Sequence, residues 1–276
     1  MKDKIKALLQ KAYKLGLVPL TILEEPTLMM PSKDRILSMK DKFAGQRCFI
    51  IGNGPSLNRI DINKIKDEYS FGVNSIFYMT ERNGFRPSFY VVEDNHVLFD
   101  NLEEINKYDV DYKFFPSFYK NVIKNDQNVL FFNMNRGFYD EVSPNFCIPR
   151  FSTNCDKRIY AGQSVTIINL QLAFYMGFTE VYLIGMDFEY KVTKKDIVSQ
   201  GNDILSTEDD DQNHFDPRYF GAGKKWHDPK LENVLVSYKF CKIIYERFGR
   251  KIYNATPGGK LEVFDRVDYE GLFKKK

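Results

Sequence analysis

Short apolar runs of three to five residues recur through the middle of the chain, and stretches with helical spacing separate several of them. A run of this length, rich in β-branched and aromatic residues, is typical of a strand that is buried on both faces. The alternation of such strands with helices predicts an α/β fold with a mostly parallel sheet and helices on both faces. The predicted strands are residues 48–51, 70–73, 88–92, 112–115, 129–132, 181–184 and 251–253.

Two longer helices complete this pattern. Residues 163–176 are predicted to form a buried helix that ends at Gly177, and residues 231–248 are predicted to form a second helix. A chain of 276 residues fits one large domain better than two complete ones. We therefore predict a single domain over residues 45–276, preceded by an N-terminal appendage over residues 1–44. A long polar stretch at about residues 190–229 is predicted to be a lid loop over a site.

The appendage opens with a basic amphipathic helix. Residues 1–17 place apolar side chains at helical spacing and five lysines among the other positions. Such a helix can lie on the anionic cytoplasmic face of an inner membrane, or it can pack on the domain or on a second subunit of a homo-oligomer. Residues 19–42 contain three prolines and are predicted to form a connector.

Composition excludes several classes of protein. The formal net charge of +3 is too small for the basic stripe of a nucleic-acid binder, so no nucleic-acid partner is predicted. The four cysteines are scattered and there are only three histidines, so we predict no metal site and a reducing, cytoplasmic location. No apolar run is long enough to span a bilayer.

The strongest local motif is the turn Gly52-Asn53-Gly54-Pro55-Ser56 after the first predicted strand. Glycines let a backbone approach a ligand closely, and the N–H groups at the start of a helix favour a phosphate. Leu57 stands where a dinucleotide-binding motif needs its third glycine, so NAD is disfavoured. A tight turn without a ligand remains the alternative.

Polar residues also follow the other predicted strands. Asn74 follows the second strand, Glu93 and Asp94 follow the third, and Asp187 follows the strand at 181–184. The carboxyl ends of parallel strands form the edge at which open α/β sheets bind ligands. Each of these residues could instead be a turn residue or a helix cap.

Two histidines, His214 and His227, lie in or beside the long polar stretch. An imidazole has a pKa near 6.5 and is therefore well matched to proton abstraction at neutral pH. Both are candidates for a general base, although a surface histidine in a loop is ordinarily inert.

Several features occur in the order that is typical of one known group. They are GNGPSL, Asn74, Arg158 and Gly162 before a buried helix, GFTEVYLIGMDF, and a histidine-containing loop. The chain resembles the bacterial sialyltransferases of the Campylobacter lipooligosaccharide type. It also resembles the wider 6-hydroxymethylpterin diphosphokinase MptE-like family, which includes motility accessory factors. The resemblance covers roughly residues 46–253.

This resemblance implies a single Rossmann-like domain with a lid and a metal-independent, inverting transfer from a CMP-activated sugar. It places Asn53 at the donor phosphate or sugar, and Asn74 and Ser56 at the cytidine nucleotide. Arg158 would lie at the sugar carboxylate or in the site wall. The family's base falls on His227, and a second histidine falls on His214.

Two departures from the pattern concern the donor. Glu189 stands where the sialyltransferases have a tyrosine, with Tyr190 one place later, and a strand-end asparagine is replaced near Glu93 and Asp94. An added carboxylate beside a phosphate repels it unless it binds a metal or a sugar hydroxyl. The predicted donor-binding residues are Gly52, Asn53, Gly54, Ser56, Asn74, Asp94, Arg158, Gly162, Gln163, Glu189 and Tyr190, and the predicted catalytic residues are His227, His214 and Asp187.

The sequence therefore predicts a glycosyltransferase that moves sialic acid, another nonulosonate or Kdo from a CMP-activated donor to a surface glycan or glycolipid, with no cofactor. One alternative is diphosphoryl transfer from ATP to a pterin-like alcohol, in which Asp187, Glu189, Glu93 and Asp94 would hold Mg²⁺. The other is a nucleotide-binding protein without catalysis.

Overall fold

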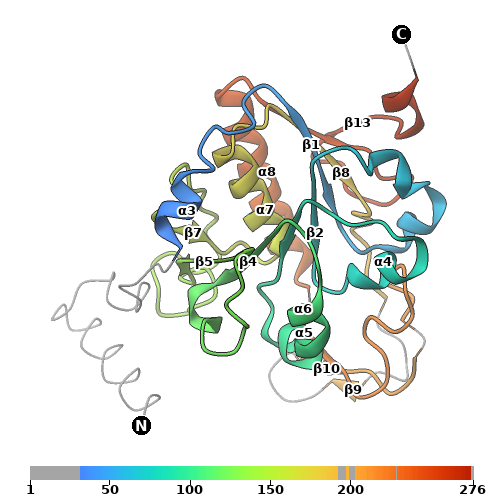
Figure 1. Ribbon diagram of the computed structural model, residues 1–276. Coiled ribbons are helices and arrows are strands. Elements are labelled where there is room, and N and C mark those ends of the chain that lie inside the picture. Colours follow the sequence, from blue (N-terminus) through green and yellow to red (C-terminus); the bar gives the residue numbers. More distant parts are fainter. Residues whose placement is uncertain (1–31, 192–196, 199–202, 210, 228, 275–276) are drawn as a thin grey trace, which may run out of the picture.

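The computed structural model describes residues 32–191, 197–198, 203–209, 211–227 and 229–274, and its centre is a parallel sheet of eight strands (Figure 1). The strands lie in the order β5-β4-β3-β2-β1-β8-β12-β13, and every neighbouring pair is parallel. This confirms the predicted α/β fold. The strands are β1 (Arg47–Ile51), β2 (Ser70–Val73), β3 (Phe89–Val91), β4 (Tyr112–Pro116), β5 (Val129–Phe132), β8 (Glu180–Ile184), β12 (Lys251–Asn254) and β13 (Asp265–Arg266).

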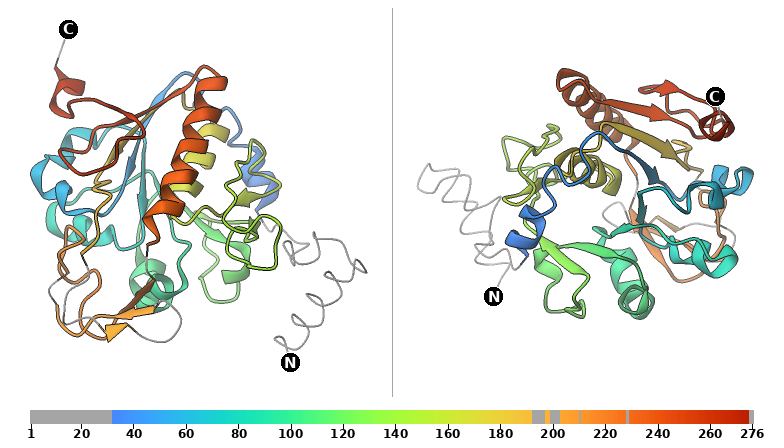
Figure 2. Two further views of the ribbon diagram at one scale, coloured as in Figure 1. Left: turned by 180° about the vertical axis from the view of Figure 1, so that it is seen from behind. Right: turned by 45° about the horizontal axis from the view of Figure 1, so that its top comes forward.

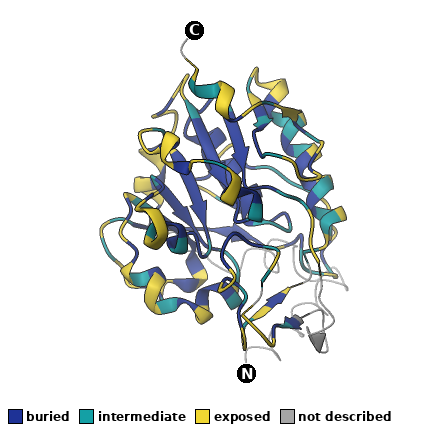
Figure 3. Ribbon diagram, turned by 90° about the vertical axis from the view of Figure 1, so that its right-hand side faces the viewer, coloured by how far each residue is buried: buried dark blue, intermediate teal, exposed yellow. Residues whose placement is uncertain are grey.

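The central strands are buried on both faces, as their continuous apolar sequences predict. In β1, Cys48 and Ile50 belong to the core on one face of the sheet, while Phe49 and Ile51 belong to the core on the other. This alternation follows from the two-residue period of a strand. The dark-blue strands between yellow outer helix surfaces in Figure 3 show the resulting layers.

One face is covered by α3 (Lys33–Leu37), α7 (Val165–Tyr175) and α8 (Leu231–Arg247), with α8 running beside α7 in Figure 2. Every residue of α7 is buried. Ser164 caps the start of α7, since its hydroxyl accepts a hydrogen bond from the N–H of Thr166 at 3.3 Å. The helix ends at the predicted Gly177, which has a φ of 97°.

The described part of the predicted connector packs on the sheet. Ile36, Met39 and Phe43 are buried in the core on the α7 face, and Nη1 of Arg35 donates to the carbonyl of Val129 at 2.8 Å. Residues 32–44 are therefore part of the domain. The predicted basic helix at residues 1–17 lies outside the described residues.

The other face is covered by short elements, which we describe together. The Gly52–Ser56 turn leads into two short 3-10 helices. The elements on this face are η1 (Pro55–Arg59), η2 (Ile62–Ile65), α4 (Phe77–Asn83), α5 (Asn95–Asp100), α6 (Leu102–Lys107), η3 (Ser117–Tyr119) and η4 (Glu270–Phe273).

Two small sheets lie outside the main one. β6 (Met134–Asn135) pairs in parallel with β7 (Ile159–Tyr160). The stretch predicted as a lid, which we call the lid below, carries the antiparallel strands β9 (Ile197–Val198), β10 (Asp203–Leu205) and β11 (Lys225–His227). The lid was predicted as a loop, because strands of two or three residues leave no periodic pattern. In the described ranges, no helix is long and apolar enough to cross a bilayer.

Candidate functional site

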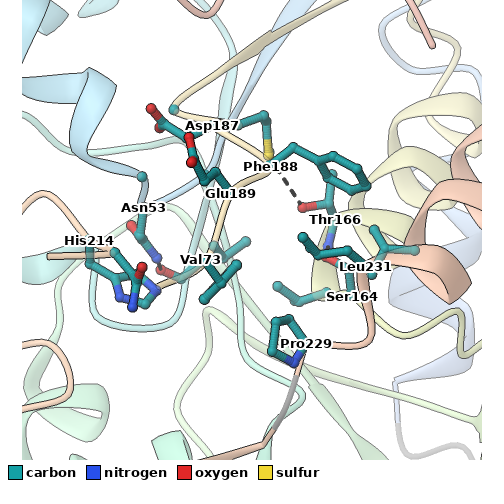
Figure 4. A pocket seen from close by; sticks show the side chains of 18 of the residues that line it. Asn53, Val73, Ser164, Thr166, Asp187, Phe188, Glu189, His214, Pro229 and Leu231 are labelled. Carbon is teal, nitrogen blue, oxygen red and sulfur yellow. Dashed lines mark hydrogen bonds between the residues drawn. The ribbon is translucent and has the colours of Figure 1, made fainter. Parts of the chain in front are cut away.

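A pocket lies where the strand order of the sheet reverses. From β1 the chain proceeds outward through β2 to β5 and then returns to β8, on the opposite side of β1. Open α/β sheets bind ligands at this switch point, outside the carboxyl ends of the strands. The pocket is lined by Gly52, Asn53, Gly54, Val73, Asn74, Gln163, Ser164, Val165, Thr166, Gly185, Met186, Asp187, Phe188, Glu189, Tyr190, Asn213, His214, Tyr219, Pro229, Leu231, Val234 and Tyr238 (Figure 4).

The glycines of the predicted motif allow the turn after β1 to lie directly against the turn after β8. The N–H of Gly52 donates to the carbonyl of Ile184 at 2.8 Å, and the N–H of Gly54 donates to the carbonyl of Gly185 at 2.9 Å. A Cβ added at Gly52 would lie 2.4 Å from the carbonyl oxygen of Gly185. Side chains at these positions would force the two turns apart.

The predicted use of this turn as a phosphate cradle does not fit its hydrogen bonds. The N–H groups of Gly52 and Gly54 already bond within the protein. Ser56 donates to Oδ2 of Asp187 through its N–H at 3.2 Å and through its hydroxyl at 2.6 Å. Asp187 thus takes the capping role that the sequence left open as its alternative, and Ser56 is buried and bonded to it.

Asn53 lies in the pocket wall with one side-chain atom unsatisfied (Figure 4). Its Nδ2 donates to the carbonyl of Val73 at 3.0 Å and to the hydroxyl of Tyr219 at 3.1 Å. Its Oδ1 is buried and has no hydrogen-bond partner. A buried acceptor without a partner costs about 1–3 kcal/mol, so this oxygen favours a ligand that brings an N–H or O–H donor. Asn74 lies beside the same tyrosine hydroxyl.

The N-terminus of α7 forms the opposite wall of the pocket. Gln163, Ser164, Val165 and Thr166 all line it, and Gln163 has a φ of 71° at the entry to the helix. The N–H groups of Thr166 and Ile167 bond to Ser164, so what this eleven-residue helix offers an anion at its N-terminus is the positive end of its dipole. This wall can therefore stabilise a phosphate, the role that the sequence assigned to the glycine turn.

Three tyrosines add hydroxyl groups to the pocket. Burial raises the pKa of Tyr238 to about 12 and raises the pKa values of Tyr190 and Tyr219 further above their usual range. Like any tyrosine with a pKa of 10 or above, all three are protonated at neutral pH and carry an O–H donor, although the hydroxyl of Tyr238 already lies 3.9 Å from Sδ of Met186. Tyr190 was predicted, whereas Tyr219 and Tyr238 were not, because no pattern marks them in the sequence.

His214 is buried in the lid and forms part of the pocket wall. Its Nδ1 lies 2.7 Å from Oδ2 of Asp211, and its ring stacks on Tyr219 with the centroids 3.8 Å apart. The next residue, Phe215, donates its N–H to the carbonyl of Asn53 at 2.8 Å. These contacts attach the lid to the turn after β1, and they fix the imidazole of His214 against the pocket.

His227 occupies a different place, at the carboxyl end of β3. It lies on β11, two residues before Pro229 in the pocket wall, and 43% of its side chain is exposed. Its Nε2 lies 3.8 Å from Oδ2 of Asp94, and its ring lies 4.4 Å from that of His96. Asp94 itself caps α5 by accepting from the N–H of Val97 at 3.1 Å. The structure thus separates the two histidines, one inside the pocket and one beside it.

The remaining predicted residues are spread around this site. Glu189 lines the pocket and forms a 2.9 Å ion pair with Lys260, which lowers the pKa of the carboxyl. Arg158 and Gly162 are not among the lining residues. A Cβ at Gly162 would lie 2.7 Å from Ile167, so this glycine allows the chain to enter α7 closely.

The four carboxylates considered for Mg²⁺ do not converge. Asp187 caps η1, Asp94 caps α5 and Glu189 pairs with Lys260. Within the part of the chain that the structure describes, no three His, Cys, Asp or Glu residues lie together as a metal site would need.

Glu93 gives a pH-dependent prediction. Its pKa is raised from 4.5 to about 7, chiefly by burial and then by Asp94. Because the pKa of this carboxyl is higher in the folded protein than in the unfolded chain, protonation of Glu93 stabilises the folded state. This stabilisation is complete below pH 4.5 and is lost as the pH rises through 7. Between pH 5 and pH 8 the wild-type protein should lose about 2 kcal/mol of stability relative to Glu93→Gln. Urea unfolding at the two pH values measures this, and a pH-independent difference would contradict it.

Lys224 gives a prediction for the lid. Its Nζ donates to the Tyr78 hydroxyl and to Oδ1 of Asn101, both at 3.2 Å, and it also bonds two lid carbonyls. Replacing Lys224 by methionine should lower the free energy of local opening and raise the rate of proteolysis within residues 190–229 roughly tenfold. Lys225→Met, at the exposed neighbouring position, is the matched control. Equal cleavage of both variants would exclude this anchoring role.

The model of the 6-hydroxymethylpterin diphosphokinase MptE-like family matches residues 27–193, more than half of the chain. The chain belongs to this family. The matched residues include β1 to β8 and the turns of the switch point, and they end before His214 and His227. The family match therefore covers the sheet side of the site and not its histidines.

One solved structure was also found. It is the sialyltransferase CstII from Campylobacter jejuni in complex with a substrate analogue, cytidine-5'-monophosphate. It has 14% sequence identity and a TM-score of 0.45, and the match covers 81% of this chain and 85% of that one. Comparison with curated protein sequences gives no significant match.

Proposed function

We propose that this protein is a glycosyltransferase that moves an acidic sugar (sialic acid, another nonulosonate or Kdo) from a CMP-activated donor to a glycan or glycolipid acceptor. The pocket at the switch point would hold the nucleotide, and the reacting sugar would extend toward the carboxyl end of β3. One observation carries this proposal. The N-terminus of α7, which can stabilise a phosphate, and His227 lie along the same edge of the sheet.

The nucleotide half of the donor would bind in the pocket through amides, hydroxyls and the helix dipole. Oδ1 of Asn53 would accept from a donor group of the ribose or the base. The phosphate would lie at the N-terminus of α7, where the protonated hydroxyls of Tyr190 and Tyr238 can donate to it. These groups stabilise the negative charge that develops on the phosphate as it leaves.

His227 would act as the general base. It accepts the proton of an acceptor hydroxyl while the oxygen of that hydroxyl bonds to the anomeric carbon from the face opposite the phosphate. The bond between the anomeric carbon and the phosphate oxygen breaks, its electron pair leaves with CMP, and the configuration inverts. Asp94, 3.8 Å from Nε2, would stabilise the imidazolium that forms.

Release of CMP from CMP-sialic acid and from CMP-Kdo, in the presence of EDTA, tests this proposal. Wild-type protein should release CMP from one of these donors. Asn53→Ala should raise the donor KM about tenfold or more, because the variant loses the polar contacts of the pocket floor. Asn58→Ala is the matched control, since Asn58 bonds the lid carbonyl of Phe215 and does not line the pocket. Absence of CMP release from every donor would contradict the proposal.

The family match favours a second candidate, which is diphosphoryl transfer from ATP to a pterin-like alcohol. That reaction requires Mg²⁺ to bridge the phosphates. It predicts ATP consumption that depends on magnesium and is abolished by EDTA, the opposite dependence from the one proposed above.

A further inference from the structure

An aromatic surface lies near His227, on α5 and η3, the elements that follow β3 and β4. Phe99 on α5 is 55% exposed and Phe118 on η3 is 40% exposed. Both rings approach Tyr119, with centroid separations of 6.3 and 4.5 Å. We call the exposed rings of Phe99 and Phe118, together with the buried Tyr119 that both approach, the aromatic surface. Six aromatic side chains are exposed among the described residues, and Phe99 and Phe118 are two of them that approach the same ring.

This surface is continuous with the proposed base. His96 contacts His227 and lies one turn before Phe99 on α5, so both side chains are on the same side of that helix. The hydroxyl of Tyr119 donates to the carbonyl of Glu93 at 3.0 Å, next to Asp94. The carboxyl ends of β3 and β4 thus bring the aromatic surface and the base together.

A cation borders the aromatic surface. The guanidinium of Arg136, which is exposed, lies 5.4 Å from the centre of the Phe118 ring. Sugar rings have an apolar C–H face and polar hydroxyls at the edge. An aromatic floor with an arginine at its rim matches both, since the guanidinium offers five donors to hydroxyl or carboxylate oxygens.

We propose that the aromatic surface and Arg136 form the acceptor subsite, which binds the terminal sugar ring of the glycan that receives the transferred residue. The C–H face of the acceptor sugar packs on Phe99 and Phe118, and its hydroxyls bond to Arg136. The hydroxyl that attacks then lies toward His227. This inference rests on the proposed function and assigns the second substrate of that reaction.

The test separates donor chemistry from acceptor binding. CMP release is measured with water alone and with a panel of short β-galactosides, N-acetylhexosaminides and heptosides. The saccharide that accelerates release most serves as the probe. Phe99→Ala/Phe118→Ala should raise the KM for this saccharide about tenfold, and donor hydrolysis and CMP binding should not change. Arg136→Gln, which keeps the aromatic floor, should raise the same KM by a smaller factor.

Phe248→Ala is the matched control, since this ring is 57% exposed at the opposite end of the fold, at the carboxyl end of α8. The acceptor subsite is overturned if the aromatic variant leaves the acceptor KM unchanged, if it lowers hydrolysis and transfer equally, or if no saccharide accelerates CMP release. A wild-type protein that releases no CMP from any donor contradicts the proposed function instead, and unchanged CMP-induced stabilisation shows that each variant is folded.

Discussion

Replacing His227 by alanine is expected to lower the rate of sugar transfer about 10²- to 10⁴-fold, which is the usual contribution of a general base. CMP binding should be unchanged, because His227 does not line the nucleotide pocket. Since the base acts only in the transition state, kcat should fall while the donor KM stays the same. Initial rates of CMP release with acceptor, together with calorimetric titration of CMP, measure both quantities.

His214→Ala is the informative counterpart, because this histidine lines the pocket and stacks on Tyr219. Replacing His214 should weaken CMP binding and should not change the pH dependence of kcat. If His227→Ala kept full transfer activity and His214→Ala abolished it, the role of base would pass to His214. In that case Asp211, 2.7 Å from Nδ1, would be the group that orients it.

Gly52→Ala is expected to have the largest effect on stability. The added methyl group would lie 2.4 Å from the carbonyl oxygen of Gly185 and 2.7 Å from Sδ of Met186. The backbone atom cannot move without separating the turns after β1 and β8, so we expect a loss of about 3 kcal/mol in the free energy of unfolding. The same displacement opens the pocket floor and should weaken CMP binding at least about tenfold.

Gly271→Ala is the matched control for this prediction. A Cβ at Gly271 meets no atom closer than 3.2 Å, and that atom is the end of the Asp268 side chain. This variant should unfold within about 0.5 kcal/mol of wild type. Equal unfolding free energies for the two glycine variants would show that the contact between the two turns is not needed.

The parallel sheet could be predicted from the sequence because buried strands and a buried helix leave apolar runs of characteristic length. β2 and β5 coincide with the predicted residues 70–73 and 129–132, and Gly177 ends α7 as expected. The boundary of the domain could not be predicted, since Ile36 and Phe43 lie in the core and the prolines before them suggest a surface connector.

The site was predictable only in part, because hydrogen bonding decides what each polar side chain does. Asn53 and Asn74 lie in the pocket as their strand-end positions suggest. Ser56 and Asp187 bond to each other instead, and no sequence pattern distinguishes such a pair from two free ligands. Tyr219 reaches the pocket from the lid, more than 160 residues away from Asn53. Contacts over such a distance depend on the path of the lid, which has no periodicity.

A thermal-shift comparison of CMP, CDP, UDP, ADP and ATP, each with Mg²⁺ and with EDTA, tests the central claim most directly. A ligand at about 100 times its dissociation constant stabilises the folded state by about 2.7 kcal/mol, which corresponds to a rise in Tm of roughly 5 °C or more for a chain of this size. We predict selective stabilisation by CMP that survives EDTA. Stabilisation by ATP alone, dependent on Mg²⁺ and with no response to CMP, would contradict the claim and favour diphosphoryl transfer.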